Sequence, residues 1–338
     1  MSRLVTIGIP IYKRLEYLPH VLGVVEAQDY PEIDLLVSDN GMNGDAVRTI
    51  VEKHYRRPFR FRQNASTVSG SAHYTQLIHN AAGEYTTILA DDDEISPNFV
   101  SELVRLLEKH PEASVALARE EVIDAHGNVM RRSTASVPEI LRGEDFIRAV
   151  WRTRQYGFEA LCTFLAKTSK LAACGGFPEI WAATSDEDLL MVKLCLGSYV
   201  ALSTQCAFRK RFDESSFGYA IELDDLARGI RDFVAQLDSD PDVLKYAALH
   251  KTEWNELRGY LVDSAWNTYR FRWAGMYRAR MPVFRWMAAG FALPLPKYGR
   301  ALAHTLMDAA KRAALERIQR SCPQAYKVYR AAKTKLIT

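Results

Sequence analysis

Strand-like and helix-like patterns alternate over the first 95 residues, and this alternation restricts the fold more than any other feature of the chain. Helical spacing of apolar residues predicts helices between short apolar runs rich in β-branched residues. We expect the first run to end at Pro10. Such an order is typical of a mainly parallel, doubly wound sheet with helices on both faces. The predicted strands are 4–10, 33–40, 59–64 and 85–93, and the predicted helices are 16–28, 45–55 and 73–82.

Carboxylates follow two of these strands directly. Asp39 ends the second strand, and Asp91, Asp92 and Asp93 end the strand "YTTILADDD". Ligands of doubly wound sheets bind at the carboxyl ends of the strands. Burying several carboxylates together is costly unless they are paired or hold a cation, so the run predicts a hard divalent ion such as Mg²⁺ or Mn²⁺. A solvated acidic turn before the helix at 99–110 is the alternative.

Four segments have an order and spacing that together carry a resemblance. They are the first strand with its turn, "VTIGIPIYKR", the second strand "YPEIDLLVSDNG", the acidic strand "AAGEYTTILADDD", and "GGFPEIWAATSDEDLLMVKL" at 175–194. Over about residues 1–215 the chain resembles the nucleotide-sugar-dependent glycosyltransferases of family 2, which have the GT-A fold. Two positions depart from the family pattern. Lys13 stands where the family usually has Asn, and "HYTQLIHNAAGEY" lacks the family's Arg-Asn pair.

The resemblance implies a nucleotide pocket at the ends of the first two strands. Asp39 is expected to accept a hydrogen bond from the nucleobase, and Pro10, Tyr12 and Arg14 are expected to line the same pocket. For Pro10 and Tyr12 a plain turn after a strand is the alternative. The base of the donor is not readable from the sequence, and UDP is the default expectation.

The resemblance also gives the acidic run individual roles. Asp91 is expected near the ribose or the metal shell, Asp92 is expected in the nucleotide site, and Asp93 is expected to ligate the ion that bridges the donor diphosphate. The expected cofactor is therefore Mg²⁺ or Mn²⁺, with Asp93 and Asp91 as its protein ligands.

A second acidic cluster supplies the base that glycosyl transfer requires. Glu187 and Asp188 match the family's "E-D" pair, in which the aspartate removes the proton of the acceptor hydroxyl and the anomeric carbon is inverted. We expect Asp188 to be the base and Glu187 to orient it or the acceptor, with Asp186 as a rival. Capping of the following helix by Ser185 and these acids is a compatible alternative.

Other side chains are weaker candidates. Gly176, Phe177 and Trp181 precede the acidic cluster, where a glycine permits close approach of a sugar and aromatic rings can stack on it. Packing within the protein explains such aromatic residues equally well. Arg209 and Arg211 follow an apolar run at 198–208 and are positioned to contact a diphosphate, although a solvated basic turn is the alternative.

Charge divides the chain unevenly. Residues 253–338 carry 16 Lys+Arg and 5 Asp+Glu, whereas residues 1–252 carry 28 and 36. We expect a GT-A catalytic domain at 1–220, with a nucleotide-binding part at 1–100 and an acceptor-side part at 101–220, followed by a basic helical region at 221–338. In that region cations alternate with aromatic residues over 267–302, which favours an anionic membrane surface. A homo-oligomer interface and core packing are the alternatives, and the acidic first part argues against nucleic acid as a partner.

Cysteine usage and hydropathy indicate the compartment. Five scattered cysteines form neither a zinc-binding spacing nor a disulfide framework. The N-terminus lacks the apolar core of a signal peptide, and no apolar stretch is long enough to span a bilayer. We expect a cytoplasmic protein, either free or peripheral on the inner face of the plasma membrane.

The sequence therefore predicts an inverting, metal-dependent glycosyltransferase of hexosyl type. We expect it to move a sugar from a nucleoside-diphosphate sugar to a saccharide or a lipid-linked saccharide, in the synthesis of O-antigen, capsule or exopolysaccharide. A sugar-1-phosphate nucleotidylyltransferase is one alternative, but the turn "IPIYKRLEYL" lacks the glycine-rich loop expected of that class. A non-catalytic, membrane-associated scaffold with the same fold is the other.

Overall fold

The chain forms two compact units in a computed structural model. The structure describes residues 3–153, 164–212, 221–274 and 283–294, and the single residues Gly299, Ala303, Leu306 and Met307. The first unit comprises residues 1–265 and the second comprises residues 266–338. We describe each unit by itself.

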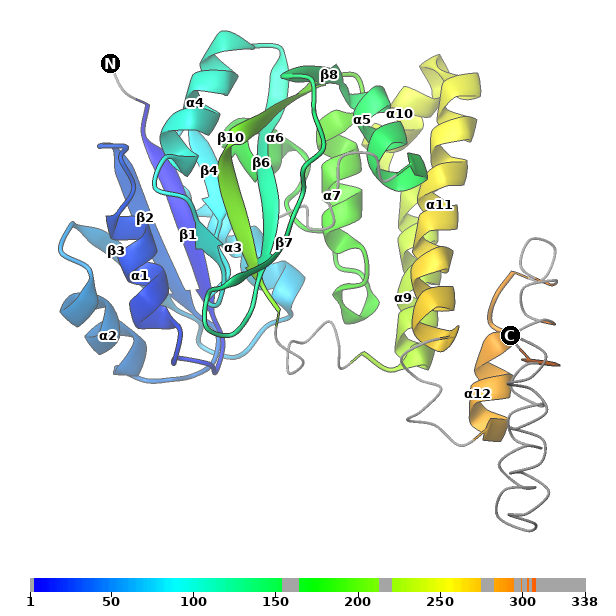
Figure 1. Cartoon of the computed structure of the whole chain (residues 1–338), viewed down its shortest axis with the longest axis horizontal. Coiled ribbons are helices and arrows are strands. Elements are labelled where there is room, and N and C mark those ends of the chain that lie inside the picture. Colours follow the sequence, from blue (N-terminus) through cyan, green and yellow to red (C-terminus); the bar gives the residue numbers. More distant parts are fainter. Residues whose placement is uncertain are drawn as a thin grey trace, which may run out of the picture. The chain divides into compact units, whose positions relative to one another are not determined.

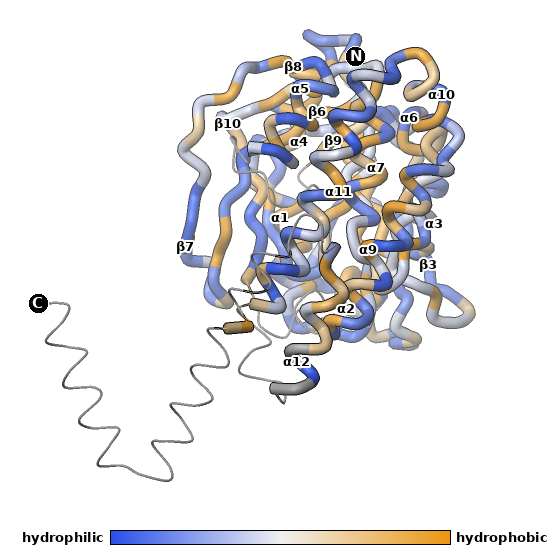
Figure 2. The backbone as a smooth tube through the Cα atoms, turned by 90° about the vertical axis from the view of Figure 1, so that its right-hand side faces the viewer, coloured by the Kyte–Doolittle hydropathy of each residue, from blue (hydrophilic) through white to orange (hydrophobic). Residues whose placement is uncertain are grey.

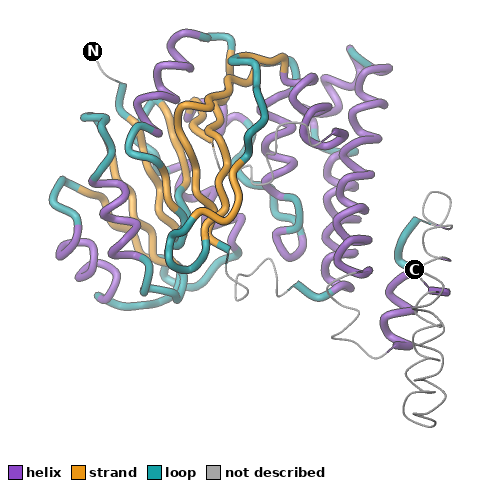
Figure 3. The backbone as a smooth tube through the Cα atoms, viewed as in Figure 1, coloured by secondary structure: helices purple, strands orange, loops and turns teal. Residues whose placement is uncertain are grey.

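The first unit contains a mixed sheet and the helices around it (Figures 1 and 3). Its strands are β1 (Val5–Ile11), β2 (Ile33–Asp39), β3 (Phe59–Gln63), β4 (Tyr85–Ile88), β5 (Glu94–Ile95), β6 (Ala113–Ile123), β7 (Val129–Arg132), β8 (Ile140–Arg142), β9 (Phe164–Lys167) and β10 (Tyr199–Arg211). Its helices are α1 (Leu18–Glu26), α2 (Ala46–His54), α3 (Gly70–His79), α4 (Phe99–Lys109), α5 (Gly143–Ile147), the π-helical turn η1 (Arg148–Thr153), α6 (Thr168–Ala173), the 3₁₀ turn η2 (Trp181–Ala183), α7 (Asp186–Cys195), α9 (Leu223–Leu237) and α10 (Pro241–Leu249). Helix α11 (Lys251–Ala274) begins in the first unit, and α12 (Val283–Gly290) lies in the second.

The strand order among the described residues is β3-β2-β1-β4-β9-β6-β10-β5. Strands β3, β2, β1 and β4 are parallel, as the sequence predicts. The second half of the sheet is mixed, because β9 runs antiparallel to both β4 and β6 while β10 runs parallel to β6. The α/β class is confirmed, and the antiparallel pairings beyond β4 are an addition that the repeating pattern of the first 95 residues did not indicate.

Alternation along β1 sorts its side chains onto the two faces of the sheet. Val5, Ile7, Ile9 and Ile11 are fully buried in the core that includes the apolar faces of α1, α2 and α4. On the other face, Gly8 admits helix α3, whose Leu77 would lie 3.3 Å from an added Cβ. The expectation that the strand ends at Pro10 is wrong, since β1 continues in register with β2 through Ile11.

The order of the strands reverses direction at β1. The chain runs outward from β1 to β2 and β3, and α3 then returns it to β4 on the other side of β1. Ligands of open α/β sheets bind in the crevice at such a switch point, outside the carboxyl ends of the strands. The loops after β1 and β4 therefore frame the expected binding region.

The helices after residue 220 belong to two different units. The first unit reaches residue 265, beyond the domain boundary expected at 220, and it includes α9, α10 and the first part of α11. Helix α9 buries one apolar face, which includes Leu226, Ile230 and Phe233. Figure 2 shows apolar and polar residues interleaved along α9 and α11, as expected of helices that cover a core on one side only.

In the second unit, aromatic side chains pack on one another. The rings of Trp273 and Trp286 stack with centroids 4.8 Å apart, and each indole Nε1 donates to the backbone carbonyl of the other residue at 2.7 Å. Phe271 and Phe291 are 74% and 62% exposed. The segment expected to lie on a membrane thus uses part of its aromatic residues for packing, and its residues 275–282, 295–298 and 300–302 lie outside the described residues. No helix in the described part of the chain has the length and apolar character needed to cross a membrane.

The entry into β4 generates a stability prediction. A Cβ on Gly83 would lie 2.5 Å from the backbone nitrogen of Thr6 and 2.7 Å from the carbonyl oxygen of Tyr85, and backbone cannot move aside cheaply. We expect Gly83→Ala to lower the free energy of unfolding by roughly 1–3 kcal/mol. Gly23→Ala, in an exposed turn of α1 with open space around it, is expected to raise it by about 0.5–1 kcal/mol. Urea unfolding measures both, and equal stability of the two variants would contradict the prediction.

Candidate functional site

The acidic run lies at the switch point of the sheet. Asp91, Asp92 and Asp93 follow β4, and the last two are 8% exposed. Arg14, in the loop after β1, places Nη2 2.6 Å from Oδ2 of Asp92 and 3.7 Å from Oδ1 of Asp91. An ion pair therefore joins the two loops that frame the switch point, and the expected nucleotide-site residues Arg14, Asp91 and Asp92 lie together.

The charge of the run is only partly compensated. Burial, and next the charge of Asp92, raise the pKa of Asp91 to about 7. The same two causes raise the pKa of Asp93, and the charge of Glu187 adds to them. The negative charge of Glu187, in the first turn of α7, therefore influences the acidic run. The structure thus brings the expected metal-binding acids and one of the expected catalytic acids into one electrostatic environment.

These carboxylates suit a cation by their chemistry. Carboxyl groups whose pKa is raised by burial and by each other are those that a divalent ion would stabilise in the charged form. Mg²⁺ typically takes one or two carboxylates and completes its shell with water and phosphate. Asp91 and Asp93 fit this donor set, while no group of three His, Cys, Asp or Glu among the described residues could hold a metal by itself.

Arg211 binds residues 92–94 of the acidic run through both its backbone and its side chain. Its backbone N–H donates to Oδ1 of Asp93 at 2.8 Å, and its Nε donates to the carbonyl oxygen of Asp92 at 2.8 Å. Its Nη2 donates to Glu94 at 2.7 Å, and its Nη1 donates to the carbonyl oxygens of Asp124 and Ala125. The side chain is 3% exposed. The expectation that Arg211 contacts a diphosphate is therefore replaced by a structural role, because its guanidinium is buried and engaged within the protein.

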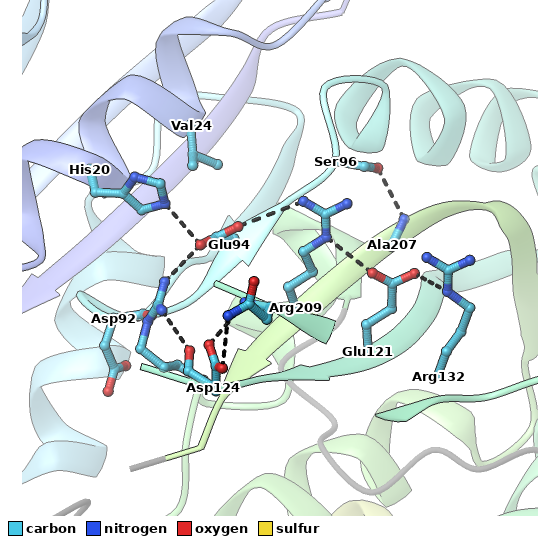
Figure 4. A network of polar contacts seen from close by, with 12 residues as sticks. His20, Val24, Asp92, Glu94, Ser96, Glu121, Asp124, Arg132, Ala207 and Arg209 are labelled. Carbon is cyan, nitrogen blue, oxygen red and sulfur yellow. Dashed lines mark hydrogen bonds and ion pairs between the residues drawn. The ribbon is translucent and has the colours of Figure 1, made fainter. Parts of the chain in front are cut away.

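Arg209 belongs to the same network, which Figure 4 shows around Glu94. Its Nε donates to Glu121 at 3.0 Å, and its Nη1 lies 3.6 Å from Glu94. His20 contacts Glu94 at 2.8 Å from the opposite side. Arg209 lies within β10, so the solvated basic turn considered from the sequence is not formed. Two acids already pair with its guanidinium, which remains 35% exposed.

Asp39 organises the loop after β2. Its carboxylate is fully buried and accepts hydrogen bonds from the backbone N–H groups of Gly41 and Asn43 at 2.8 and 3.0 Å. The side-chain amides of Asn43 and Gln63 donate to it at 2.7 and 3.0 Å. Asn43 also donates to the carbonyl oxygen of Tyr12 at 2.6 Å, so the structure brings Tyr12 and Asp39 together. The four donors give Asp39 a structural role that the sequence did not indicate.

Tyr12 is an exposed residue where the loops after β1 and β2 meet. Its ring is 49% exposed, and the Lys13 ammonium lies 5.1 Å from the ring centroid. Pro10 precedes Tyr12 in the chain and is buried within β1, so it contributes no exposed surface to the loop. Close packing of the two loops explains Gly41, since an added Cβ would overlap the carbonyl oxygen of Tyr12.

The second acidic cluster opens helix α7 with two distinct environments. Asp186 is 6% exposed and accepts hydrogen bonds from the Ser71 hydroxyl at 2.7 Å and from the backbone N–H of Glu187 at 2.9 Å. Burial, and next the charge of Glu187, raise the pKa of Asp186 to about 7. Glu187 and Asp188 are half-buried. The indole Nε1 of Trp151 donates to Oδ1 of Asp188 at 3.3 Å.

The segment before α7 is strained. Ala182, Ala183 and Ser185 all have positive φ, at 54°, 47° and 64°. Non-glycine residues in this region cost about 1–3 kcal/mol each and cluster at functional sites. Ser185 makes no side-chain hydrogen bond to the helix, so its expected role as a capping side chain is wrong. Helix α7, which carries the acidic cluster, is therefore preceded by a left-handed residue and not by a side-chain cap.

Helix α9 anchors this strained segment through Trp181. The indole Nε1 donates to Asp225 at 2.8 Å and the backbone N–H donates to Asp232 at 2.9 Å. The Arg228 guanidinium lies 3.3 Å from the ring centroid. Trp181 remains 41% exposed, so part of its ring can meet a ligand.

The two other expected acceptor residues have packing roles. Phe177 is 3% exposed and meets Tyr74 edge-on, with centroids 5.1 Å apart. Gly176 has φ 76°, and a Cβ there would lie 2.7 Å from the Thr75 side chain. Close packing of this segment on α3 therefore accounts for both residues, and Trp181 is the member of the set that is exposed.

Sequence reasoning missed the contacts that three residues make with the candidate acids. Ser71, Trp151 and Arg211 reach them from segments 37 to 119 positions away along the chain. Arg211 was singled out for another role, while Ser71 and Trp151 carry no local signal, because neither their type nor their spacing distinguishes a contact made only in the folded chain.

Comparisons with known proteins indicate the family of the chain. The model of the glycosyl transferase family 2 matches residues 6–175. An uncharacterized glycosyltransferase of Rickettsia conorii is 28% identical over 190 residues, which are 55% of this chain and 30% of that protein. One of Rickettsia felis is 27% identical over 188 residues, with the same shares. The chain thus spans less than a third of the length of these curated relatives.

Solved structures share the fold. Staphylococcus aureus TarS 1–349, in complex with UDP-GlcNAc, superposes with a TM-score of 0.64 at 15% identity, covering 90% of this chain and 89% of that one. The mannosyltransferase PcManGT of Pyrobaculum calidifontis, in complex with GDP-Man and Mn²⁺, gives a TM-score of 0.50 at 16% identity, covering 92% and 87%. The expected GT-A class is confirmed by this likeness. With the family model matching half of its 338 residues, the chain belongs to glycosyl transferase family 2.

Proposed function

We propose that the chain is an inverting, divalent-metal-dependent glycosyltransferase that moves a sugar from a nucleoside-diphosphate sugar to a hydroxyl of a saccharide or lipid-linked saccharide. One observation carries the proposal: buried carboxylates with raised pKa values at the switch point share their environment with Glu187 at the start of α7. A cation bound by these carboxylates and an acid at the start of α7 would then act on one substrate. Nucleotide sugars in TarS and PcManGT support the donor class.

The donor end of the site is formed by the loops after β1, β2 and β4. Asp91 and Asp93 would hold the divalent cation, which would supply Lewis-acid stabilisation of the departing diphosphate. Exposed Tyr12 offers a ring to the nucleoside, and Arg14 holds Asp92 in place. Asp39 could bind the nucleobase only if one of its four hydrogen bonds from the protein were broken. Its main role is therefore to hold the loop after β2 in shape.

The acceptor end begins at α7. Asp188 takes the proton of the acceptor hydroxyl as that oxygen bonds to the anomeric carbon, and the bond from this carbon to the diphosphate breaks with its electron pair leaving on the nucleoside diphosphate. Attack from the face opposite the leaving group inverts the anomeric carbon. Glu187 lies beside Asp188 and orients it or the acceptor. Trp181, partly exposed and anchored on α9, lines the acceptor side.

The basic C-terminal region supports a partner of matching chemistry. Residues 266–338 carry 15 Lys+Arg against 2 Asp+Glu, and Phe271 and Phe291 of the second unit are exposed. Cations with exposed aromatic residues suit an anionic membrane surface. We propose that this region binds such a surface at the inner face of the plasma membrane, where lipid-linked acceptors of polysaccharide synthesis would be reached.

Asp93→Asn is expected to abolish metal-dependent nucleotide binding. Calorimetry with UDP, dTDP, GDP and CMP, each with and without Mn²⁺, should find one nucleotide whose affinity depends on the metal in the wild type. The matched control is Asp45→Asn, an exposed aspartate before α2. Because the pKa of Asp91 is raised to about 7, its charge is lost as the pH falls below 7, and the metal-dependent affinity should be weaker at pH 6 than at pH 8. Unchanged Mn²⁺-dependent affinity in Asp93→Asn would exclude the metal role.

Asp188→Asn is expected to keep nucleotide binding and to reduce sugar transfer by a factor of about 10² to 10⁴. Turnover is measured as release of nucleoside diphosphate from UDP-glucose, UDP-GlcNAc or GDP-mannose. Asp186→Asn is the matched comparison, since this buried side chain can still accept the Ser71 hydrogen bond as an amide. If Asp186→Asn abolished turnover while Asp188→Asn left it unchanged, the base would be Asp186.

Replacing both Phe271 and Phe291 by Ser is expected to weaken binding to phosphatidylglycerol-containing vesicles by about tenfold or more, because each buried Phe contributes roughly 1.5–3 kcal/mol. Sedimentation with vesicles measures the effect, and added salt should weaken binding of the wild type. Leu249→Ser, at a residue of the first unit that is also 74% exposed, is the control. Equal binding of the double variant and the control would argue for self-association through this region instead.

A further inference from the structure

Trp151 makes a contact to the catalytic cluster that the proposed function does not use. Its indole is 8% exposed and meets Phe146 edge-on, with centroids 6.3 Å apart and an interplanar angle of 85°. The Nε1–H group donates to Oδ1 of Asp188 at 3.3 Å. An N–H···O bond of that length is weak, but it fixes direction, and such bonds often tighten only when substrate is bound.

An unusual backbone conformation carries Trp151. Residues 148–153 form the π-helical turn η1, which directly continues α5. A π-helical turn is rare, occurs mostly as a single turn within an α-helix and is frequent at functional sites. Relative to an α-helical continuation, it changes the direction in which a side chain leaves the helix. In this chain the redirected side chain is the one that contacts Asp188.

Helix α11 holds the turn from the other side. Nη2 of Arg148 donates to Glu253 at 2.8 Å and to Glu256 at 3.3 Å. The Arg152 guanidinium lies 4.9 Å from the centroid of the Tyr260 ring. All three α11 residues belong to the first unit. A continuous series of contacts therefore runs from α11 through η1 to Asp188.

We propose that Trp151 is a positioning residue for Asp188 and that α11 keeps it in place through η1. The inference rests on the proposed function, in which Asp188 is the base. A base must be held within a few tenths of an ångström of its working position, and a hydrogen bond from a packed, rigid indole to one carboxylate oxygen restricts its rotation. Asp186 and Glu187 lie at the same end of the helix, and their negative charges repel that of Asp188. A hydrogen bond from the indole N–H stabilises the charged carboxylate against this repulsion.

The hydrogen bond can be tested without substrate. The chain has 6 tryptophans, so indole ¹⁵N labelling of the full-length protein gives few signals, and Trp151→Phe identifies the one from Trp151. We expect this indole signal to move as the pH is changed across the titration of Asp188, and to stop moving in Asp188→Asn. A signal with the same pH dependence in wild type and Asp188→Asn would overturn the contact.

Turnover then tests the role. Using release of nucleoside diphosphate from UDP-glucose, UDP-GlcNAc and GDP-mannose, we expect Trp151→Phe to lower kcat about tenfold with nucleotide affinity unchanged, and to move the acidic limb of the pH profile to higher pH. Trp254→Phe, at another buried tryptophan in α11, is the matched control for loss of an indole. Arg148→Gln should show a smaller effect of the same kind.

The outcomes separate the two hypotheses. If the wild type releases nucleotide and Trp151→Phe behaves like Trp254→Phe in kcat and pH profile, the positioning role is wrong while the proposed function stands. If the wild type binds and turns over none of the nucleotide sugars, the proposed function fails, and the catalytic meaning of this contact fails with it. A loss of stability alone, seen as equal falls in both variants, would also overturn the inference.

Discussion

Burying the negative charge of the run 91–94 is the constraint on which the rest of the first unit depends. Arg14 neutralises it from the loop after β1, and Arg211 neutralises it from the end of β10, which lies beyond β9 and β6 in the sheet. The closest ion pair of Arg14 is with Asp92 at 2.6 Å, and that of Arg211 is with Glu94 at 2.7 Å. The pKa values of Asp91 and Asp93 nevertheless remain raised. A bound cation would stabilise the charged form of these carboxyl groups, which the protein compensates only in part.

This electrostatic arrangement also shows which parts of the site the sequence could predict. The strands β1, β2 and β4 and the acids at their ends were predictable, because apolar runs and their polar boundaries are local patterns. The partners of those acids were not. Arg211 was expected at a diphosphate because it follows an apolar run, with a solvated basic turn as the alternative, whereas β10 continues through this residue and its guanidinium is buried. Whether a basic side chain pairs with an acid of the protein or binds a ligand depends on how the strands pair, and strand pairing cannot be read from a local sequence pattern.

The same distinction holds on the acceptor side. The identity of α7 and its acids followed from pattern and resemblance, but their environments did not. Asp186 and Asp188 are two positions apart, yet one is buried against Ser71 and the other is half-buried beside Trp151. A helix turns through about 200° over two residues, so adjacent acids in sequence meet different neighbours. Roles within such a cluster can be assigned only once the surrounding elements are placed.

The family model ends at residue 175, and the elements that hold the acceptor side come largely from beyond it. Helix α9 approaches the strained turn so closely that a Cβ on Gly229 would lie 2.5 Å from both the Thr184 hydroxyl and the Trp181 carbonyl oxygen. The contacts of Trp181 with α9 therefore supply stabilisation that offsets the positive φ angles between it and α7. The strands that carry the run 91–93 thus lie within the matched region, whereas α9 and α11 lie outside it. The strain at 182–185 is thus linked to α9, because the backbone that leads into α7 and its acids is held by contacts from a helix beyond the matched region.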